Sequence, residues 1–265
     1  MNRMEQIQIL IEALLRDLPD CRPQAGQVPK TEFAQRRLLR GLMNLRPPLP
    51  LDGDFLAVQD ALLSQEREER GVVEGTDLPP AALHPKLSLW QGDITRLRVD
   101  AIVNAANSAL LGCFHPCHSC IDNAIHSAAG LQLRDECYQI MQAQGHPEPN
   151  GQAKGTGGYN LPASAVLHTV GPVVQSYVTQ RDRDELRSCY QSCLTLAAQS
   201  GLQSVAFCCI STGLFHFPNR EAAALAVQTV TEFLKTPSSI QRVVFNVFQD
   251  LDFQIYQALL NPGRP

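Results

Sequence analysis

The stretch Ser204–Phe215, SVAFCCISTGLF, decides the fold class of this chain. Its first part, Ser204–Ile210, is β-prone and contains a continuous apolar run, which is typical of a strand buried on both faces of a sheet. A small, glycine-containing turn follows, and then the helical periodicity of Glu221–Leu234. A buried strand, a turn and a helix in this order indicate a largely parallel sheet with helices on both sides.

The same alternation of short β-prone runs and helical segments begins at about Leu87 and continues to the C-terminal region. The sequence predicts further strands at Leu87–Trp90, Ala101–Val103, Gly155–Tyr159, Ala165–Val170 and Arg242–Phe248. It predicts further helices at Ile121–Ala128, Leu131–Gln142, Asp184–Gln199 and Asp252–Leu259. In α/β sheets of this kind, ligands bind at the carboxyl ends of the strands.

Residues 1–80 follow a different pattern, in which helical segments alternate with proline-rich turns. Helical spacing of apolar residues is clear in Ile7–Leu15, Leu38–Leu45 and Phe55–Leu63. We therefore expect a helical N-terminal extension over residues 1–80 and one α/β domain over residues 81–265. The extension shows no catalytic constellation, and we expect a solvated face for Arg36, Arg37 and Arg40.

The overall composition is that of a globular protein, with 265 residues of which 44% are apolar and 18% charged. The net charge of −4 gives no general attraction to nucleic acid or to an anionic membrane. No apolar run is long enough to span a bilayer, and the first residues do not resemble a signal peptide. The composition therefore indicates a cytoplasmic protein, with neither nucleic acid nor a membrane as a partner.

Three of the nine cysteines, Cys113, Cys117 and Cys120, lie within eight residues beside His115 and His118. This cluster contains the pattern Cys113-x4-His118-x-Cys120. Two thiolates and an imidazole suit zinc, and a chain without an export signal favours metal binding over disulfides. Three protein ligands would leave a position open, which is the pattern of catalytic zinc. Two alternatives remain: Cys117 or a distant residue closes a structural site, or the thiols bind no metal.

Polar and small residues follow several predicted strands. Asn104 and Asn107 flank two alanines directly after the predicted strand Ala101–Val103. They either contact a ligand or form a plain turn. Asp93, after Gly92, either accepts hydrogen bonds from a ligand amine or caps the next turn. The turn Ser211–Phe215 can direct successive amides at a phosphate, although it matches no Walker or dinucleotide motif. No general base is assigned to His126, His168 or His216.

Taken together, these segments resemble a macrodomain, the ADP-ribose-binding α/β/α module, from about Leu87 to Leu260. The resemblance rests on five segments in order: Gln91–Thr95, Val103–Asn107, Ile121–Gly130, His168–Pro172 and Ile210–Phe215. The insertion Gly112–Cys120 is similar to that of the zinc-containing branch, microbial protein-ADP-ribose hydrolases that also carry a helical N-terminal extension. The resemblance implies a three-layer α/β/α fold around a mixed, largely parallel sheet.

The resemblance also implies roles for individual residues. The adenine would contact Asp93, Ile94 and Phe248, and Asn104 would contribute to ligand binding. The diphosphate would be surrounded by Ser211, Thr212, Gly213, Leu214 and Phe215. The catalytic residues at the distal ribose would be Asn107 and Asp122, although the zinc insertion replaces the glycine-rich loop that accompanies this aspartate in other hydrolytic macrodomains. The zinc ligands would be Cys113, His118 and Cys120, with Cys117 outside the set.

The implied activity is zinc-dependent removal of mono-ADP-ribose from acidic side chains of a modified protein. The zinc branch is often linked to a sirtuin-type transferase and a lipoylated carrier protein, which implies an ADP-ribosylated protein as substrate. One alternative is a reader module that binds ADP-ribose without turnover around a structural zinc. Another is a zinc hydrolase acting on a free nucleotide or small ester. The sequence does not identify the substrate protein, the acceptor side chain, the oligomeric state or the role of the N-terminal helices.

Overall fold

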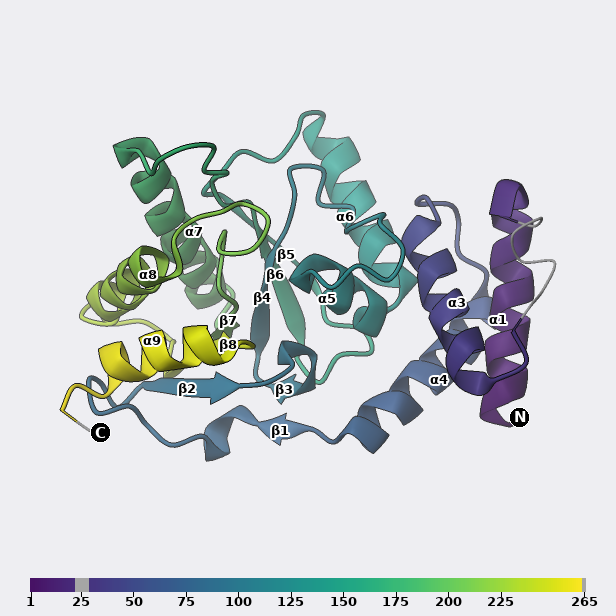
Figure 1. Cartoon of the computed structure of the whole chain (residues 1–265), viewed down its shortest axis with the longest axis horizontal. Coiled ribbons are helices and arrows are strands. Elements are labelled where there is room, and N and C mark those ends of the chain that lie inside the picture. The colour runs from purple at the N-terminus through teal and green to yellow at the C-terminus, as the bar shows by residue number, and fades with distance from the viewer. Residues whose placement is uncertain (22–28, 264–265) are drawn as a thin grey trace.

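A six-stranded sheet forms the centre of the structure, in the order β2-β8-β7-β4-β6-β5 (Figure 1). The computed structural model describes residues 1–21 and 29–263; residues 22–28 and 264–265, which fall in the expected extension and the expected domain, lie outside the described residues. The strands are β2 (Leu87–Gln91), β4 (Ala101–Ala105), β5 (Ala153–Gly157), β6 (Ala165–Thr169), β7 (Ser204–Phe207) and β8 (Arg242–Val247). All neighbours are parallel except β5, which runs antiparallel to β6 at one edge. The predicted mixed, largely parallel sheet is therefore confirmed.

Helices cover both faces of this sheet and complete three layers (Figure 1). One layer consists of α7 (Gln180–Gln199), α8 (Asn219–Phe233) and α9 (Asp250–Leu260). The opposite layer consists of α5 (Ile121–Ala129) and α6 (Leu131–Gln144). The central strands are buried on both sides, as the continuous apolar run after Ser204 predicted: Val205, Ala206, Val243 and Val244 are fully inaccessible to solvent. Burial of this apolar surface is the main stabilising contribution to the domain.

Several element boundaries differ from the sequence prediction, among them those of β5, β7 and α7. β5 ends at Gly157, two residues before the predicted end, and Tyr159 adopts a left-handed φ of 52° in the following turn. β7 ends at Phe207 although the apolar run continues to Ile210. α7 begins four residues early, because Thr179 and Asp182 form a capping box ahead of the apolar periodicity.

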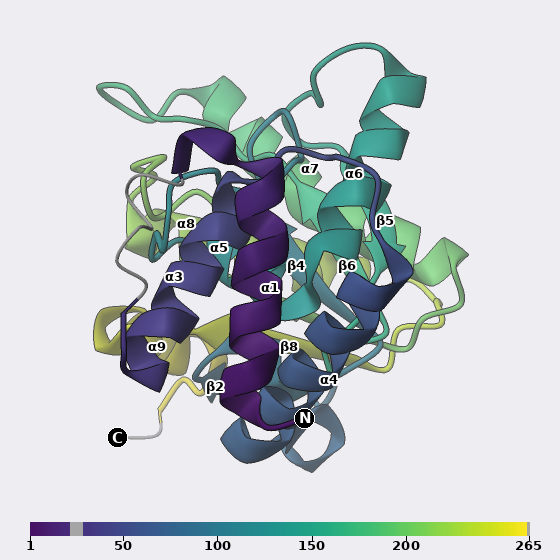
Figure 2. The same ribbon diagram turned by 90° about the vertical axis from the view of Figure 1, so that its right-hand side faces the viewer.

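The N-terminal helices α1 (Arg3–Asp17), α3 (Glu32–Leu45) and α4 (Gly53–Arg70) lie outside the layer of α5 and α6 (Figures 1 and 2). They enclose an apolar core of their own, made of Ile7, Leu10, Ile11, Leu14, Leu39, Leu42, Met43, Leu62 and Leu131. Among the described residues, Leu131 is the only buried member of this core from outside the three helices, so the first residue of α6 links the extension to the α/β layers.

The structure also contains short elements. β1 (Val73–Glu74) and η2 (Gly75–Asp77) connect α4 of the extension to β2, whereas η1 (Pro19–Cys21) follows α1 within the extension. η3 (Ile94–Arg96) and β3 (Leu97–Arg98) lie between β2 and β4. β1 pairs in parallel with β3, which anchors the chain that leaves α4. Among the described helices, none combines the length and apolar character needed to cross a bilayer.

Candidate functional site

A cleft of about 740 Å³ opens beyond the carboxyl ends of the central strands. Most of the residues that the sequence predicted at a site line it together: Asp93, Ile94, Asn107, Cys113, His118, Cys120, Asp122, Ser211, Thr212, Gly213, Leu214, Phe215 and Phe248. The elements that bring them together are the ends of β4 and β8, η3, the first turn of α5 and the two loops after β4 and β7. The cleft therefore lies at the strand ends, where the sequence predicted a site.

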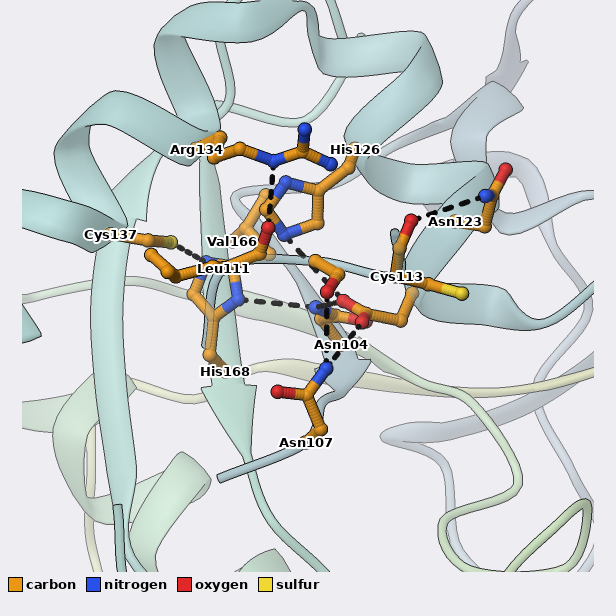
Figure 3. Close-up of polar contacts among 12 residues, drawn as sticks. Asn104, Asn107, Leu111, Cys113, Asn123, His126, Arg134, Cys137, Val166 and His168 are labelled. Atoms are coloured by element: carbon orange, nitrogen blue, oxygen red, sulfur yellow. Dashed lines mark hydrogen bonds and ion pairs between the residues drawn. The ribbon is translucent and has the colours of Figure 1, made fainter. Parts of the chain in front are cut away.

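Asn104 does not line the cleft, so the expectation that it contacts the ligand is corrected. Its side chain is completely buried on β4, where Nδ2 donates to Oδ1 of Asp122 at 2.8 Å. The same nitrogen lies 3.2 Å from Nδ1 of His168 on the paired strand β6 (Figure 3). Asn104 thus acts beneath the cleft, by orienting Asp122.

The carboxyl group of Asp122 is held at the wall of the cleft by two amides. Oδ1 accepts from Asn104, and Oδ2 accepts from Nδ2 of Asn107 at 3.3 Å. Asn107 also donates to the Gly112 carbonyl at 3.1 Å and accepts from the Ala109 amide at 3.0 Å. Burial raises the pKa of Asp122 to about 6, and the bonds from Asn104 and Asn107 and the charge of Arg134 act in the opposite direction.

Two buried histidines lie beneath Asp122 and outside the cleft lining. His168 hydrogen bonds with Oγ1 of Thr156 at 2.9 Å, and burial lowers its pKa to about 4. Burial also lowers the pKa of His126 well below its ordinary value, so this ring is neutral although its Nε2 lies 3.5 Å from Asp122. The donor atoms of His126, Cys137 and His168 approach one another closely enough for a metal, but the nearby charge of Arg134 opposes a cation there.

Cys113, His118 and Cys120 form the metal-binding candidate that faces the cleft. Their donor atoms all lie within 4.8 Å of one another, with Sγ of Cys113 3.6 Å from Nδ1 of His118. Cys120 is the N-cap of α5, and its sulfur accepts from the Asn123 amide at 3.4 Å. The Asn123 amide favours the thiolate form that zinc requires, whereas burial and the neighbouring Cys113 raise the pKa of the Cys120 thiol. The chemistry and spacing of these donors fit zinc.

Cys117 points away from these three donors. Its thiol donates to the Arg37 carbonyl on α3 at 3.3 Å, and its backbone adopts a left-handed φ of 53°. Among the described residues, the compact donor set contains neither Cys117 nor His115. This arrangement leaves three protein donors beside the cleft.

The loop Ser211–Phe215 lines the same cleft as these metal donors. The amides of Gly213, Leu214 and Phe215 pair with no acceptor among the described residues. The Oγ of Ser211 is likewise buried without a partner among them, at a backbone φ of 65°. Unpaired donors gathered in one small loop are suited to bind an anion such as a diphosphate.

The Gly171→Ala variant is expected to bind ADP-ribose about 10- to 100-fold more weakly, because a tight contact beneath this loop leaves no space for a methyl group. A Cβ at position 171 would lie 2.1 Å from Oγ of Ser211 and 2.8 Å from Cγ2 of Ile210. Calorimetric titration with ADP-ribose measures the change. Gly53→Ala on α4 is the matched control, since a Cβ there also meets no atom within 4 Å; equal affinity in both variants would contradict the prediction.

Arg40 lines the cleft from the N-terminal extension, and its expected solvated position is wrong. Its guanidinium donates to Oδ1 of Asn123 at 2.7 Å and to the His118 carbonyl at 3.2 Å. Arg36 pairs with Glu66 on α4, whereas Arg37 is exposed as expected. No sequence signal marked Arg40, because a single arginine on a polar helix face has no distinguishing pattern.

Comparison with known proteins shows to which family the chain belongs. The Macro domain family model matches residues 103–226. A protein-ADP-ribose hydrolase of Treponema medium is 48% identical over 263 residues, which cover 98% of this chain and 100% of the relative. A protein-ADP-ribose hydrolase of Staphylococcus aureus (strain Mu50 / ATCC 700699) is 52% identical over 225 residues, 84% of each chain.

Solved structures show the same similarity. The Trypanosoma brucei macrodomain in complex with ADP-ribose superposes with a TM-score of 0.66 at 32% identity, covering 83% of this chain and 95% of that one. The Oceanobacillus iheyensis macrodomain with ADP gives a TM-score of 0.58 at 36% identity, covering 64% of this chain and 87% of that one. Because the similarity to the Treponema relative extends over almost the full length of both proteins, this chain belongs to the Macro domain family.

Proposed function

We propose that this chain is a zinc-dependent protein-ADP-ribose hydrolase, which removes mono-ADP-ribose from acidic side chains of modified proteins. The observation that carries the proposal is the composition of one cleft: unpaired amides gather in one loop, and three metal donors lie beside Asn107 and Asp122. The names and the extent of the bacterial relatives support the hydrolase class. The zinc dependence and the acidic acceptor are our inference from the cleft and from the resemblance.

The adenine and diphosphate ends of the cleft would bind and orient the ligand. Asp93 caps η3 through Oδ1, which accepts from the Thr95 amide at 3.0 Å and from the Thr95 hydroxyl at 2.7 Å. Its Oδ2 lies 3.5 Å from Arg70 and is available to an amine of the base. Phe248 is 75% exposed at the cleft, an apolar surface on which the base can pack. Binding energy from these groups would hold the distal ribose in register.

The reacting end would be organised by Asn107 and Asp122. Cys113, His118 and Cys120 would hold a zinc ion, which would supply Lewis-acid chemistry there. Asn107 would position the distal ribose, since its own amide is fixed by Gly112, Ala109 and Asp122. Asp122 presents a carboxyl group, oriented by two amides, to a ribose hydroxyl or to the attacking water. Hydrolysis would join the water oxygen to C1 of the ribose and release the protein carboxyl group.

A turnover assay separates this hydrolase from a reader module. We expect the zinc-loaded chain to release many equivalents of free ADP-ribose from a protein modified on aspartate or glutamate. Asn107→Ala is expected to lower kcat by about 100-fold, because misplacement of the ribose by about 1 Å has an effect of this size. A lipoylated carrier protein modified by a sirtuin-type transferase is the first substrate to test. Tight binding with no release above the spontaneous rate would identify a reader instead.

A further inference from the structure

The segment 111–120, here called the metal loop, contains no helix or strand among its ten residues. Its backbone polar groups are instead bound by side chains from other elements. The Leu111 carbonyl accepts from Arg134 at 2.7 Å, and the Gly112 carbonyl accepts from Asn107 at 3.1 Å. The carbonyls of Cys113 and His115 both accept from Nδ2 of Asn123 (Figure 3 shows the contact with Cys113). The geometry of the three metal donors therefore depends on side chains outside the loop.

Arg40, on α3 of the N-terminal extension, contacts the metal loop directly and also contacts Asn123, which binds the loop. Nη2 of Arg40 donates to the carbonyl of His118 at 3.2 Å and to Oδ1 of Asn123 at 2.7 Å. Arg40 thus contacts one expected zinc ligand directly and also fixes the amide that holds the carbonyl of a second, Cys113. A charged donor makes stronger hydrogen bonds than a neutral one, so Arg40 is the principal contact between α3 and the donor set.

Asn44, one helical turn after Arg40, holds the middle of the metal loop. It is almost completely buried; its Oδ1 accepts from the Cys117 amide at 2.9 Å, and its Nδ2 donates to Ser127 on α5 at 3.0 Å. Cys117 has a φ of 53°, a left-handed conformation that costs a residue with a side chain about 1 kcal/mol. Such a conformation persists where outside contacts hold it, and α3 supplies two of them, from Asn44 and from the Arg37 carbonyl.

The position of α3 is set independently of the metal loop. Leu39, Leu42 and Met43 of α3 pack against α1 and α4 in the apolar core of the extension. Figure 2 shows α1 between α3 and α4 on this side of the molecule. A helix fixed by its own core can impose a geometry on the irregular segment that it contacts, because close-packed cores deform little.

We propose that α3 of the N-terminal extension positions the metal loop for zinc, with Arg40 as the positioning residue that orients His118. This inference rests on the proposed zinc site and assigns a role to an extension that has no catalytic side chain of its own. Arg40 acts through the backbone of a ligand residue, so its loss alters the metal site more than it alters the adenine and diphosphate ends. The side chains that orient metal ligands typically contribute 10- to 100-fold to metal affinity or activity.

The test compares Arg40→Met with Arg37→Met and Arg40→Lys in the full-length chain. Arg37 is the matched control, because it precedes Arg40 by three residues on α3 and its side chain is exposed. Three quantities are measured: the zinc dissociation constant by competition with a chromophoric chelator, the thiolate charge-transfer spectrum of the cobalt-loaded protein, and the Kd for ADP-ribose by calorimetry.

We expect Arg40→Met to bind zinc about 10-fold more weakly, to show an altered cobalt spectrum, and to keep its affinity for ADP-ribose. Arg40→Lys, which retains a cation, is expected to recover part of the zinc affinity, and Arg37→Met to match the unmodified chain. Equal zinc affinity in Arg40→Met and Arg37→Met would overturn the proposal. A parallel loss of ADP-ribose affinity and thermal stability would also overturn it, since that result indicates general unfolding. An unmodified chain that binds no zinc would overturn the proposed zinc function itself.

Discussion

His118→Ala is expected to lose stoichiometric zinc and to release ADP-ribose from modified protein at least about 100-fold more slowly than the unmodified chain. His118 supplies the imidazole between two thiolates, and its Nδ1 lies 3.6 Å from Sγ of Cys113. Replacement of a residue that orients a metal ligand typically lowers metal affinity or activity by 10- to 100-fold. Replacement of the ligand itself should lower them by more. Metal analysis of the purified protein and single-turnover release of ADP-ribose measure the two losses together.

Cys117→Ala is the control that tests the number of ligands. Its thiol donates to a carbonyl on α3 and lies outside the compact donor set, so this variant is expected to keep one zinc per chain and most of the activity. Loss of zinc in Cys117→Ala would show a closed four-ligand site and would favour a structural ion. Full activity in a folded, zinc-free His118→Ala protein would contradict the zinc mechanism directly.

The elements that sequence reasoning located well are those whose signal is local. The continuous apolar run after Ser204 predicted a buried strand without any knowledge of the neighbouring strands. The structure confirms this burial for β7, and its neighbour β8 is buried in the same way. β5 was misplaced by two residues because Ala153–Gly157 is a glycine-containing edge strand with little apolar alternation. The start of α7 was missed because its first turn is polar and is stabilised by Thr179 and Asp182.

The site shows the same division between local and distant information. Cys113, His118 and Cys120 lie within eight residues, so their spacing alone predicted a shared site. Arg40 donates to the backbone carbonyl of His118, 78 residues away in the sequence. Every residue has a backbone carbonyl, so the residue types could not predict this contact. Asn104 was assigned to the ligand because it ends a strand, but the face to which its side chain points depends on the sheet register with His168. Contacts of this kind become visible only once the tertiary structure is known.

Arg134→Met is expected to lower the free energy of unfolding by about 3 to 5 kcal/mol. The guanidinium is 3% exposed, and Nη1 donates to the carbonyls of Met43 and Asn44 at 3.0 Å each and to that of Arg46. These acceptors are at the C-terminal end of α3, where helical carbonyls have no partner within the helix and where a positive charge is favourable. Burial lowers the pKa of Arg134 to about 10, so the side chain remains charged at neutral pH.

Denaturation of the metal-free protein in urea measures this change as a lower midpoint at an unchanged slope. Arg187→Met is the matched control: Arg187 forms a surface pair with Asp184 at 2.8 Å, and exposed pairs contribute little to stability. Methionine keeps most of the apolar stem of Arg134, so the variant removes the guanidinium, with its hydrogen bonds and its contact 4.3 Å from the centre of the Phe114 ring. A change as small as that of Arg187→Met would mean that water replaces the guanidinium at the end of α3. The expected large change would instead show that this buried cation of α6 stabilises the C-terminal end of α3.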